Sequence, residues 1–252
     1  MHAIIVVPCY NEEKRLDGEA FRRFNLQGDR VDFLFVNDGS SDGTGRVLDA
    51  LHDANPDRFQ VLHLERNRGK AEAVRRGLLA AFERRPDAVG FWDADLATPL
   101  SELPPFLEVL ASRPAIDMVF GARVRLLGLD ISRRSSRHYS GRVGATLISR
   151  TLGLAVYDTQ CGAKLFRNSS DIRHVFASPF LSRWIFDVEI IARFIRLRGH
   201  DQAAKAICEL PVRVWHDVEG SKIRSTDFVR ALRDLWKIHR AYPVRKRTLD
   251  NP

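Results

Sequence analysis

The chain has 252 residues, 44% of them hydrophobic and 29% charged, which is ordinary for a soluble globular protein with a sizeable core. The formal net charge of +8 indicates an anionic partner, such as nucleic acid, an anionic membrane face or a phosphorylated substrate. Three widely spaced cysteines argue against a disulfide framework, and no apolar run approaches the roughly 18 residues that span a bilayer. We therefore expect a cytoplasmic protein that is not integral to a membrane.

Strands and helices alternate through the N-terminal half. The expected strands cover residues 3–7, 31–36, 59–64, 88–92 and 118–122, and the expected helices cover 45–54 and 69–84. This order predicts an α/β fold with a Rossmann-like, mostly parallel sheet flanked by helices. Ligands of such sheets lie beyond the carboxyl ends of the strands. Polar clusters follow three of these strands, at Tyr10-Asn11-Glu12, at Asp38, and at Asp93 with Asp95, and we expect them to meet at one crevice.

The C-terminal half has a different character. Residues 125–154 are rich in arginine and serine, and further elements are expected as a helix at 185–197, a strand at 206–214 and an amphipathic helix at 228–239. A basic segment, Arg245-Lys246-Arg247, follows. Because no repeat or linker interrupts the chain, the simplest division is one domain over 1–225 and a basic amphipathic helix and tail over 226–252.

Asp93 and Asp95 are separated by one residue, directly after a buried apolar run. On an extended chain, side chains at this spacing face the same side. Two such carboxylates can share a Mg²⁺ or Mn²⁺ ion that also binds a diphosphate, because these cations prefer oxygen ligands. A turn or a helix cap is the alternative for an isolated pair. The position beside two other polar strand ends favours a metal site.

Asp38 lies in the segment Asn37-Asp38-Gly39-Ser40, where glycine permits a tight turn and the carboxylate can accept hydrogen bonds from a base or a ribose. A purely structural turn is an equal alternative for this segment. The chain contains neither the glycine fingerprint of dinucleotide-binding enzymes nor a P-loop, which disfavours both classes.

Together these motifs resemble those of the family-2 inverting glycosyltransferases, which have the GT-A fold. The resemblance covers roughly residues 3 to 225. It rests on the segments at 8–12, 37–44 and 93–95, on 67–70 and 121–123, on Asp158-Thr159-Gln160-Cys161-Gly162-Ala163-Lys164-Leu165-Phe166, and on 186–189 and 219–222. The segment at 158–166 is the most discriminating, and it is similar to the dolichyl-phosphate β-glucosyltransferase branch, close to the dolichyl-phosphate mannose synthases.

The resemblance implies a role for each matching residue. The nucleotide-sugar donor would be bound by Pro8, Tyr10, Glu12, Asp38, Lys70, Asp93, Ala94 and Lys222, and the metal by Asp93 and Asp95. Arg123 would lie near the phosphates, Gln160 and Lys164 would line the acceptor side, and Asp187 would lie close to the reacting sugar. Arg133 and Arg137 are further candidates for phosphate contacts, since arginine binds phosphate in a planar, bidentate manner; a solvated basic face is an equal alternative for each arginine.

The expected reaction is transfer of glucose from UDP-glucose to a polyprenyl phosphate. GDP-mannose as donor and a hydroxyl acceptor, with Asp187 as base, are the alternatives. Leu96-Ala97 follows Asp95 where the mannose synthases usually have Leu-Gln, and this favours the glucosyl branch. The chain starts at its first strand without the N-terminal anchor of eukaryotic relatives, so we expect peripheral attachment to an anionic membrane surface. A nucleic-acid-binding function is disfavoured because no recognisable binding motif is present.

Overall fold

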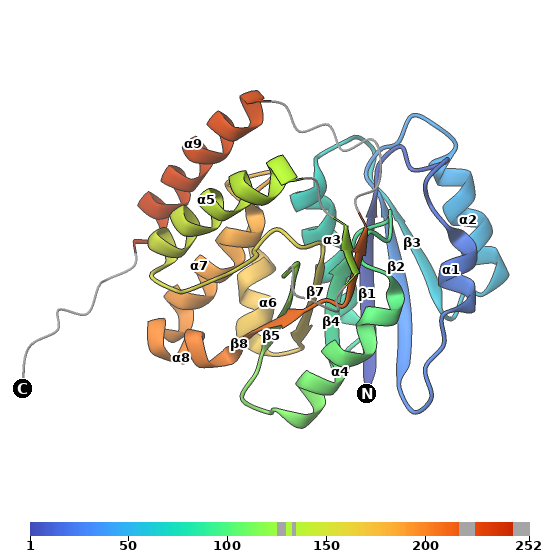
Figure 1. Cartoon of the computed structure of the whole chain (residues 1–252). Helices are drawn as coiled ribbons and strands as arrows, with labels where there is room; N and C mark the ends of the chain where they lie inside the picture. The colour runs from blue at the N-terminus through green and yellow to red at the C-terminus, as the bar shows by residue number, and fades with distance from the viewer. Residues whose placement is uncertain (125–129, 133–134, 217–224, 244–252) are drawn as a thin grey trace, which may run out of the picture.

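The computed structural model describes residues 1–124, 130–132, 135–216 and 225–243, which form a layered α/β structure (Figure 1). The strands are β1 (His2–Cys9), β2 (Arg30–Asn37), β3 (Phe59–His63), β4 (Ala88–Trp92), β5 (Met118–Ala122), β6 (Asp130–Ser132), β7 (Ala163–Arg167), β8 (Ile207–Pro211) and β9 (Val214–His216). The helices are α1 (Gly18–Arg23), α2 (Thr44–Ala54), α3 (Lys70–Glu83), the 3-10 turn Leu100–Glu102, α4 (Leu103–Ser112), α5 (Ser135–Leu152), α6 (Ser170–Ala177), α7 (Phe186–Arg198), α8 (His200–Ala206) and α9 (Ser225–Ala241).

The main sheet has the strand order β3-β2-β1-β4-β7-β5-β8. Its pairs are parallel except that β7 runs antiparallel to both β4 and β5. The predicted mostly parallel sheet is therefore confirmed. The antiparallel strand β7 is not among the strands predicted from the sequence; it falls at the end of the segment at 158–166.

Two apolar layers cover the sheet because its central strands are hydrophobic on both faces, as is typical of buried parallel strands. One face of β1, with Ile4 and Val6, packs against α3, α6 and α7, and the same core includes Leu235 and Ile238 of α9. The opposite face of β1, with Ala3 and Ile5, packs against α1, α2 and α4. Figure 1 shows α5 and α9 beyond α7 at one end of the molecule and α1 and α2 at the other.

The strand predicted over residues 206–214 is wrong in its extent. The main-sheet strand β8 ends at Pro211, level with Ala122, the last residue of its neighbour β5. The backbone amide of Arg213 then donates to the carboxylate of Glu102 at 2.8 Å, and the chain continues as β9, paired in parallel with β6 in a separate two-stranded sheet. The chain leaves the main sheet because β5 provides no pairing partner beyond Ala122.

Candidate active site at the carboxyl ends of the strands

The three polar strand ends lie side by side, because β1 is paired with both β2 and β4. Cys9 is in register with Asn37, and the backbone amide of Asp38 donates to the carbonyl of Cys9 at 2.9 Å. All three strands run in the same direction, so Tyr10, Asp38 and Asp93 follow their ends at one edge of the sheet. The sheet therefore brings these segments together as expected.

Asp93 and Asp95 lie in a tight turn, so the extended geometry expected from their spacing is wrong. The backbone amide of Leu96 donates to the carbonyl of Asp93 at 3.1 Å, and Leu96 has a positive φ of 49°. The amide of Ala97 donates to Asp95 Oδ1 at 3.1 Å. Ala94, expected to contact the donor, is buried in the core beneath the turn. The turn, and not the pleat of a strand, brings the two carboxylates to one side.

Gly162 explains why the segment at 158–166 belongs to the same site. The backbone amide of Asp93 donates to the carbonyl of Gly162 at 3.0 Å. A Cβ atom at position 162 would lie only 1.9 Å from Asp93 Oδ2. Only glycine leaves room for the Asp93 carboxylate here, so the two motifs fit together as one structural unit.

The chemistry of this carboxylate pair suits a divalent cation. Burial raises the pKa of Asp95 above its ordinary value, and the charge of Asp93 raises it further, because two anions close together disfavour each other. A bound cation would remove that repulsion. Within the described part of the chain no group of three or more His, Cys, Asp and Glu side chains forms a metal site. Two carboxylates would leave the remaining coordination positions to phosphate oxygens and water, as Mg²⁺ commonly requires.

Lys70 is the cation that the structure itself places at the pair. Its Nζ atom lies 2.5 Å from Asp93 Oδ1, and it is the first residue of α3. Burial acts to lower the pKa of Lys70, but the charges of Asp93 and Asp187 outweigh it and raise the pKa. Lys70 therefore stays charged between the two sides of the site, where it can contact a donor phosphate.

Asp38 shapes the loop that carries Lys70. Its two carboxylate oxygens accept hydrogen bonds from the backbone amides of Arg68 and Gly69, each at 2.8 Å, and the residue is only 2% exposed. Gly39, with a φ of 64°, has no room for a Cβ, which would lie 2.4 Å from the carbonyl carbon of Arg66. Both oxygens of Asp38 thus bond to the protein's own backbone, and the contact with a base or ribose stays a prediction.

The segment after β1 surrounds the outer edge of the site. Pro8 lies in β1, and Tyr10 beyond it is exposed. The carboxylate of Glu12 accepts hydrogen bonds from the guanidinium of Arg15, at 2.9 and 2.6 Å. Burial raises the pKa of Glu12, Arg15 opposes that rise, and the nearby charges of Asp95 and Asp93 add to it. Glu12 therefore lies close enough to the carboxylate pair to interact with its charge.

The acceptor-side residues converge on Asp187, in the first turn of α7. Lys164 Nζ lies 2.7 Å from Asp187 Oδ1, and Gln160 Nε2 donates to Asp187 Oδ2 at 3.4 Å. Lys164 is completely buried, with its Nζ over the rings of Phe91 and Phe120. Lys164 is therefore paired with Asp187 inside the protein, and the expectation that it lines the acceptor side stays a prediction. Burial raises the pKa of Asp187, and the charges of Lys164 and Lys70 oppose that rise.

Arg123 is held in a bidentate pair with Asp158. Its Nε and Nη2 atoms donate to the carboxylate at 2.6 and 2.8 Å, and its guanidinium lies 5.3 Å from the centre of the Trp215 ring. Burial acts to raise the pKa of Asp158, but Arg123 holds it well below the usual range. Asp158 Oδ1 also accepts the backbone amide of Gln160 at 3.0 Å. Arg123 therefore positions the segment at 158–164, and its phosphate contact stays a prediction.

Several predicted residues are not placed. Arg133 and Lys222 lie outside the described residues, and Arg137 falls within α5 with its side chain outside the described part. Sequence reasoning also missed a supporting residue. The Glu209 carboxylate accepts the amides of Tyr157 and Asp158 at distances of 2.8 to 2.9 Å. A lone glutamate in the strand β8 was the available signal, since charged residues are seldom placed in a sheet without a partner.

The comparisons with known proteins agree with this geometry. The family model described as "Glycosyl transferase family 2" matches residues 4–175. The dolichyl-phosphate β-glucosyltransferase of Saccharomyces cerevisiae is 30% identical over 261 residues, covering 94% of this chain and 74% of the relative. The enzyme of the same name from Mus musculus is 33% identical over 241 residues, covering 87% of this chain and 68% of the relative.

Solved structures confirm the predicted GT-A fold. Glucosyl-3-phosphoglycerate synthase from Mycobacterium tuberculosis, in complex with Mn²⁺ and UDP-glucose, superposes with a TM-score of 0.65 at 17% identity, covering 98% of this chain and 80% of that chain. The same enzyme with Mn²⁺, UDP and phosphoglyceric acid gives a TM-score of 0.67 at 18% identity, covering 94% and 78%. At this identity the likeness concerns the fold. With the family match over most of the chain, the protein belongs to glycosyl transferase family 2.

Proposed function

We propose that the protein transfers glucose from UDP-glucose to a polyprenyl phosphate of the dolichyl type, with inversion at the anomeric carbon. The observation that carries the proposal is the paired carboxylates Asp93 and Asp95, positioned beside Lys70 and opposite Asp187 at the sheet edge. The identities of about 30% to enzymes named dolichyl-phosphate β-glucosyltransferase support this donor and acceptor.

On the donor side, Pro8, Tyr10, Glu12 and Asp38 would surround the base and ribose, and Ala94, between the two aspartates, would lie next to the donor. Asp93 and Asp95 would hold a Mg²⁺ or Mn²⁺ ion, which supplies positive charge to the diphosphate when bound. Lys70 lies 2.5 Å from Asp93 and adds a second positive charge next to the same group. When the bond between the anomeric carbon and the diphosphate oxygen breaks, the ammonium group of Lys70 stabilises the anion that leaves.

On the acceptor side, an oxygen of the lipid phosphate attacks the anomeric carbon from the face opposite the diphosphate, which produces inversion. A phosphate is already ionised near pH 7, so the attack needs no strong base. Asp187, held by Lys164 and Gln160, would orient the sugar. Arg123, Arg133, Arg137 and Lys222 are the candidates that would offset the charge of two anionic substrates.

Attachment to the cytoplasmic face of an anionic membrane is part of the proposal. None of the helices in the described ranges is sufficiently long and apolar to span a bilayer. The outer face of α9 exposes Leu232, at 41%, and Trp236, at 58%, with Arg233 and Lys237 exposed beside them. An amphipathic helix with apolar and basic side chains on one surface suits the interface of an anionic bilayer.

The test is incubation with Mn²⁺, polyprenyl phosphate and radiolabelled UDP-glucose or GDP-mannose, followed by lipid extraction. Label in the lipid from UDP-glucose, as a β-linked product, is the expected result. Label from GDP-mannose alone would overturn the choice of sugar, and label with neither donor would overturn the lipid-phosphate acceptor. Polyprenol without its phosphate is the matched control, since its labelling would indicate a hydroxyl acceptor and Asp187 as the base.

A further inference from the structure

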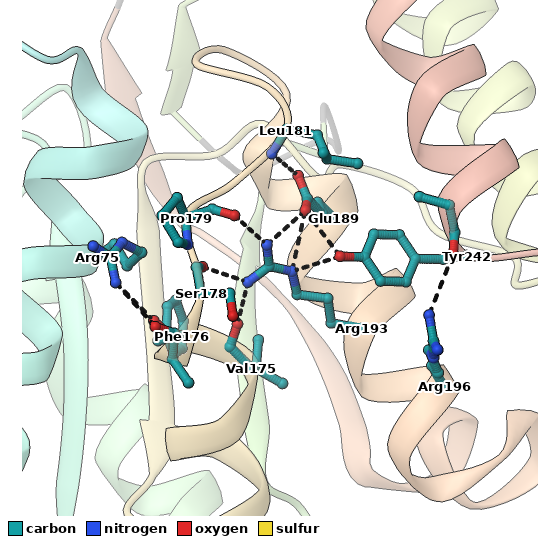
Figure 2. A network of polar contacts seen from close by, with 12 residues as sticks. Arg75, Val175, Phe176, Ser178, Pro179, Leu181, Glu189, Arg193, Arg196 and Tyr242 are labelled. Atoms are coloured by element: carbon teal, nitrogen blue, oxygen red, sulfur yellow. Dashed lines mark hydrogen bonds and ion pairs between the residues drawn. The ribbon is translucent and has the colours of Figure 1, made fainter.

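The segment that leads into α7 is held by a buried polar network rather than by apolar packing alone (Figure 2). The guanidinium of Arg193, in α7, donates to three backbone carbonyls at 2.6 to 2.8 Å. These carbonyls belong to Val175, Ser178 and Pro179. Glu189, one turn earlier in α7, pairs with Arg193 at 2.8 Å and accepts the backbone amide of Leu181 at 2.7 Å. Two side chains of α7 therefore fix the chain that precedes that same helix.

The end of α9 completes this network. Tyr242, directly after α9, accepts a hydrogen bond from Arg193 Nε at 3.1 Å, and its hydroxyl donates to Glu189 Oε1 at 3.3 Å. Buried charges are costly unless additional hydrogen bonds satisfy them. The Tyr242 hydroxyl bridges the two buried charges, so the position of α9 and the geometry of the network depend on each other.

A second contact from α9 reaches the same segment closer to the site. The hydroxyl of Ser182 donates to Asp234 Oδ2 of α9 at 2.9 Å. The hydroxyl oxygen of Ser182 in turn accepts the backbone amides of Trp184 and Ile185 at 3.2 and 3.0 Å. Ile185 is the N-cap residue of α7 and has no hydrogen-bonding side chain. Ser182 therefore supplies the hydrogen bonds at the start of α7, and Asp234 fixes the hydroxyl that supplies them.

The segment held in this way carries groups to both sides of the site. Two residues after Ile185, Asp187 meets Lys164 and Gln160. Arg183 passes beside Gly69, where a Cβ atom would lie 3.5 Å from the Arg183 Cδ. Gly69 directly precedes Lys70, the partner of Asp93. Movement of this segment would displace Asp187 relative to the carboxylate pair.

We propose that α9 is a positioning element of the acceptor side, acting through Asp234 on Ser182 and through Tyr242 on the Glu189–Arg193 pair. It holds residues 181–187 so that Asp187 remains against Lys164 and Gln160. Ser182, Asp234 and Tyr242 are positioning residues, because they act on Asp187 and touch no substrate. The inference rests on the proposed function insofar as Asp187 faces the reacting sugar.

The experiment compares Asp234→Ala with Asp234→Asn, whose amide oxygen can still accept the Ser182 hydrogen bond. Steady-state transfer to polyprenyl phosphate is measured with varied UDP-glucose. We expect Asp234→Ala to lower kcat by about tenfold with an unchanged KM for the donor, since small displacements of reacting groups cost rate. Asp234→Asn should restore kcat to within about twofold to threefold of the wild type. Ser182→Ala should match Asp234→Ala, and His239→Ala, an exposed change on the same helix, should leave kcat unchanged.

Amide hydrogen exchange of the wild type and the same variants provides a readout that does not depend on turnover. Asp234→Ala should accelerate exchange at Trp184 and Ile185 and leave the amides of α3 unchanged. Unchanged kcat and exchange in Asp234→Ala would overturn the positioning role, as would an Asn variant as impaired as the Ala variant. A wild type inactive with every donor would overturn the proposed function, while the exchange result would still decide whether α9 holds this segment.

Discussion

The donor side and the acceptor side of the site balance their charges in different ways. On the donor side, Asp93, Asp95 and Glu12 lie near one another, and burial together with mutual repulsion raises the pKa of Asp95 and of Glu12. On the acceptor side, the buried acids are paired within the protein, Asp158 with Arg123 and Asp187 with Lys164. The donor side has three carboxylates and pairs two of them, Asp93 with Lys70 and Glu12 with Arg15, so it can receive further positive charge. On the acceptor side each of the two acids has its own cation, and the pairs serve to hold groups in place.

The largest expected effect on activity comes from removing the negative charge of Asp95, which would bind the metal ion. Asp95→Asn should lower transfer by about a thousandfold, because a metal ion contributes several kcal/mol to stabilising a leaving anion. The same change should raise the melting temperature of metal-free protein, since it removes the repulsion with Asp93. Activity against Mn²⁺ concentration and thermal unfolding in EDTA are the measurements. Asp53→Asn on α2 is the control, and full activity of Asp95→Asn in EDTA would contradict the metal assignment.

Gly162 connects the two sides of the site, because it precedes Lys164 in the chain and contacts Asp93. Gly162→Ala should lower transfer by about a hundredfold, because its Cβ would occupy the position of the Asp93 carboxylate and displace it. Gly144→Ala is the matched control, because a Cβ at that position in α5 meets no atom within 4 Å. That control should leave transfer unchanged and stabilise the helix by about 0.5–1 kcal/mol. Equal activity of the two variants in the same assay would show that Asp93 tolerates displacement.

The two sides of the site also differ in how much of their structure could be predicted from the sequence. The convergence of Tyr10, Asp38 and Asp93 followed from apolar runs that end in polar clusters, because parallel strands place their carboxyl ends together. The burial of Lys164 could not be predicted, since its partner Asp187 lies 23 residues further along the chain and no local pattern connects them. The hydrogen bonds that the amides of Tyr157 and Asp158 donate to Glu209 could not be predicted for the same reason. The ends of strands can be read from a local sequence pattern, whereas the pairing of charged residues far apart in the sequence depends on the folded structure.

The internal neutralisation of the acceptor side predicts a stability effect that depends on pH. Asp158→Asn should destabilise the protein by about 3 kcal/mol near pH 7, because it leaves the buried Arg123 without its counter-charge. The pKa of Asp158 is lowered in the folded state, so its contribution is present above the ordinary carboxyl pKa and is lost as the pH falls through the folded value. The difference in unfolding free energy between wild type and variant should therefore be constant from about pH 5 to 8 and shrink below about pH 4. A difference that grows in acid would contradict the pairing.

The smallest expected effect concerns the outer surfaces of the two sides. The helix α9 packs at the end of the molecule that carries α5 and α7, and α1 and α2 lie at the other end (Figure 1). Arg233→Glu with Lys237→Glu on α9 should weaken binding to vesicles that contain phosphatidylserine by about 1 kcal/mol or somewhat more for each residue changed. The control is the double change Arg23→Glu in α1 and Arg46→Glu in α2, which alters the net charge by the same amount at the other end of the molecule. Cosedimentation with vesicles at several salt concentrations distinguishes a local contact from an effect of net charge. Only a local contact would make the α9 variant bind more weakly than the variant changed in α1 and α2. Equal weakening by both pairs would mean that net charge, and not the surface of α9, attracts the membrane.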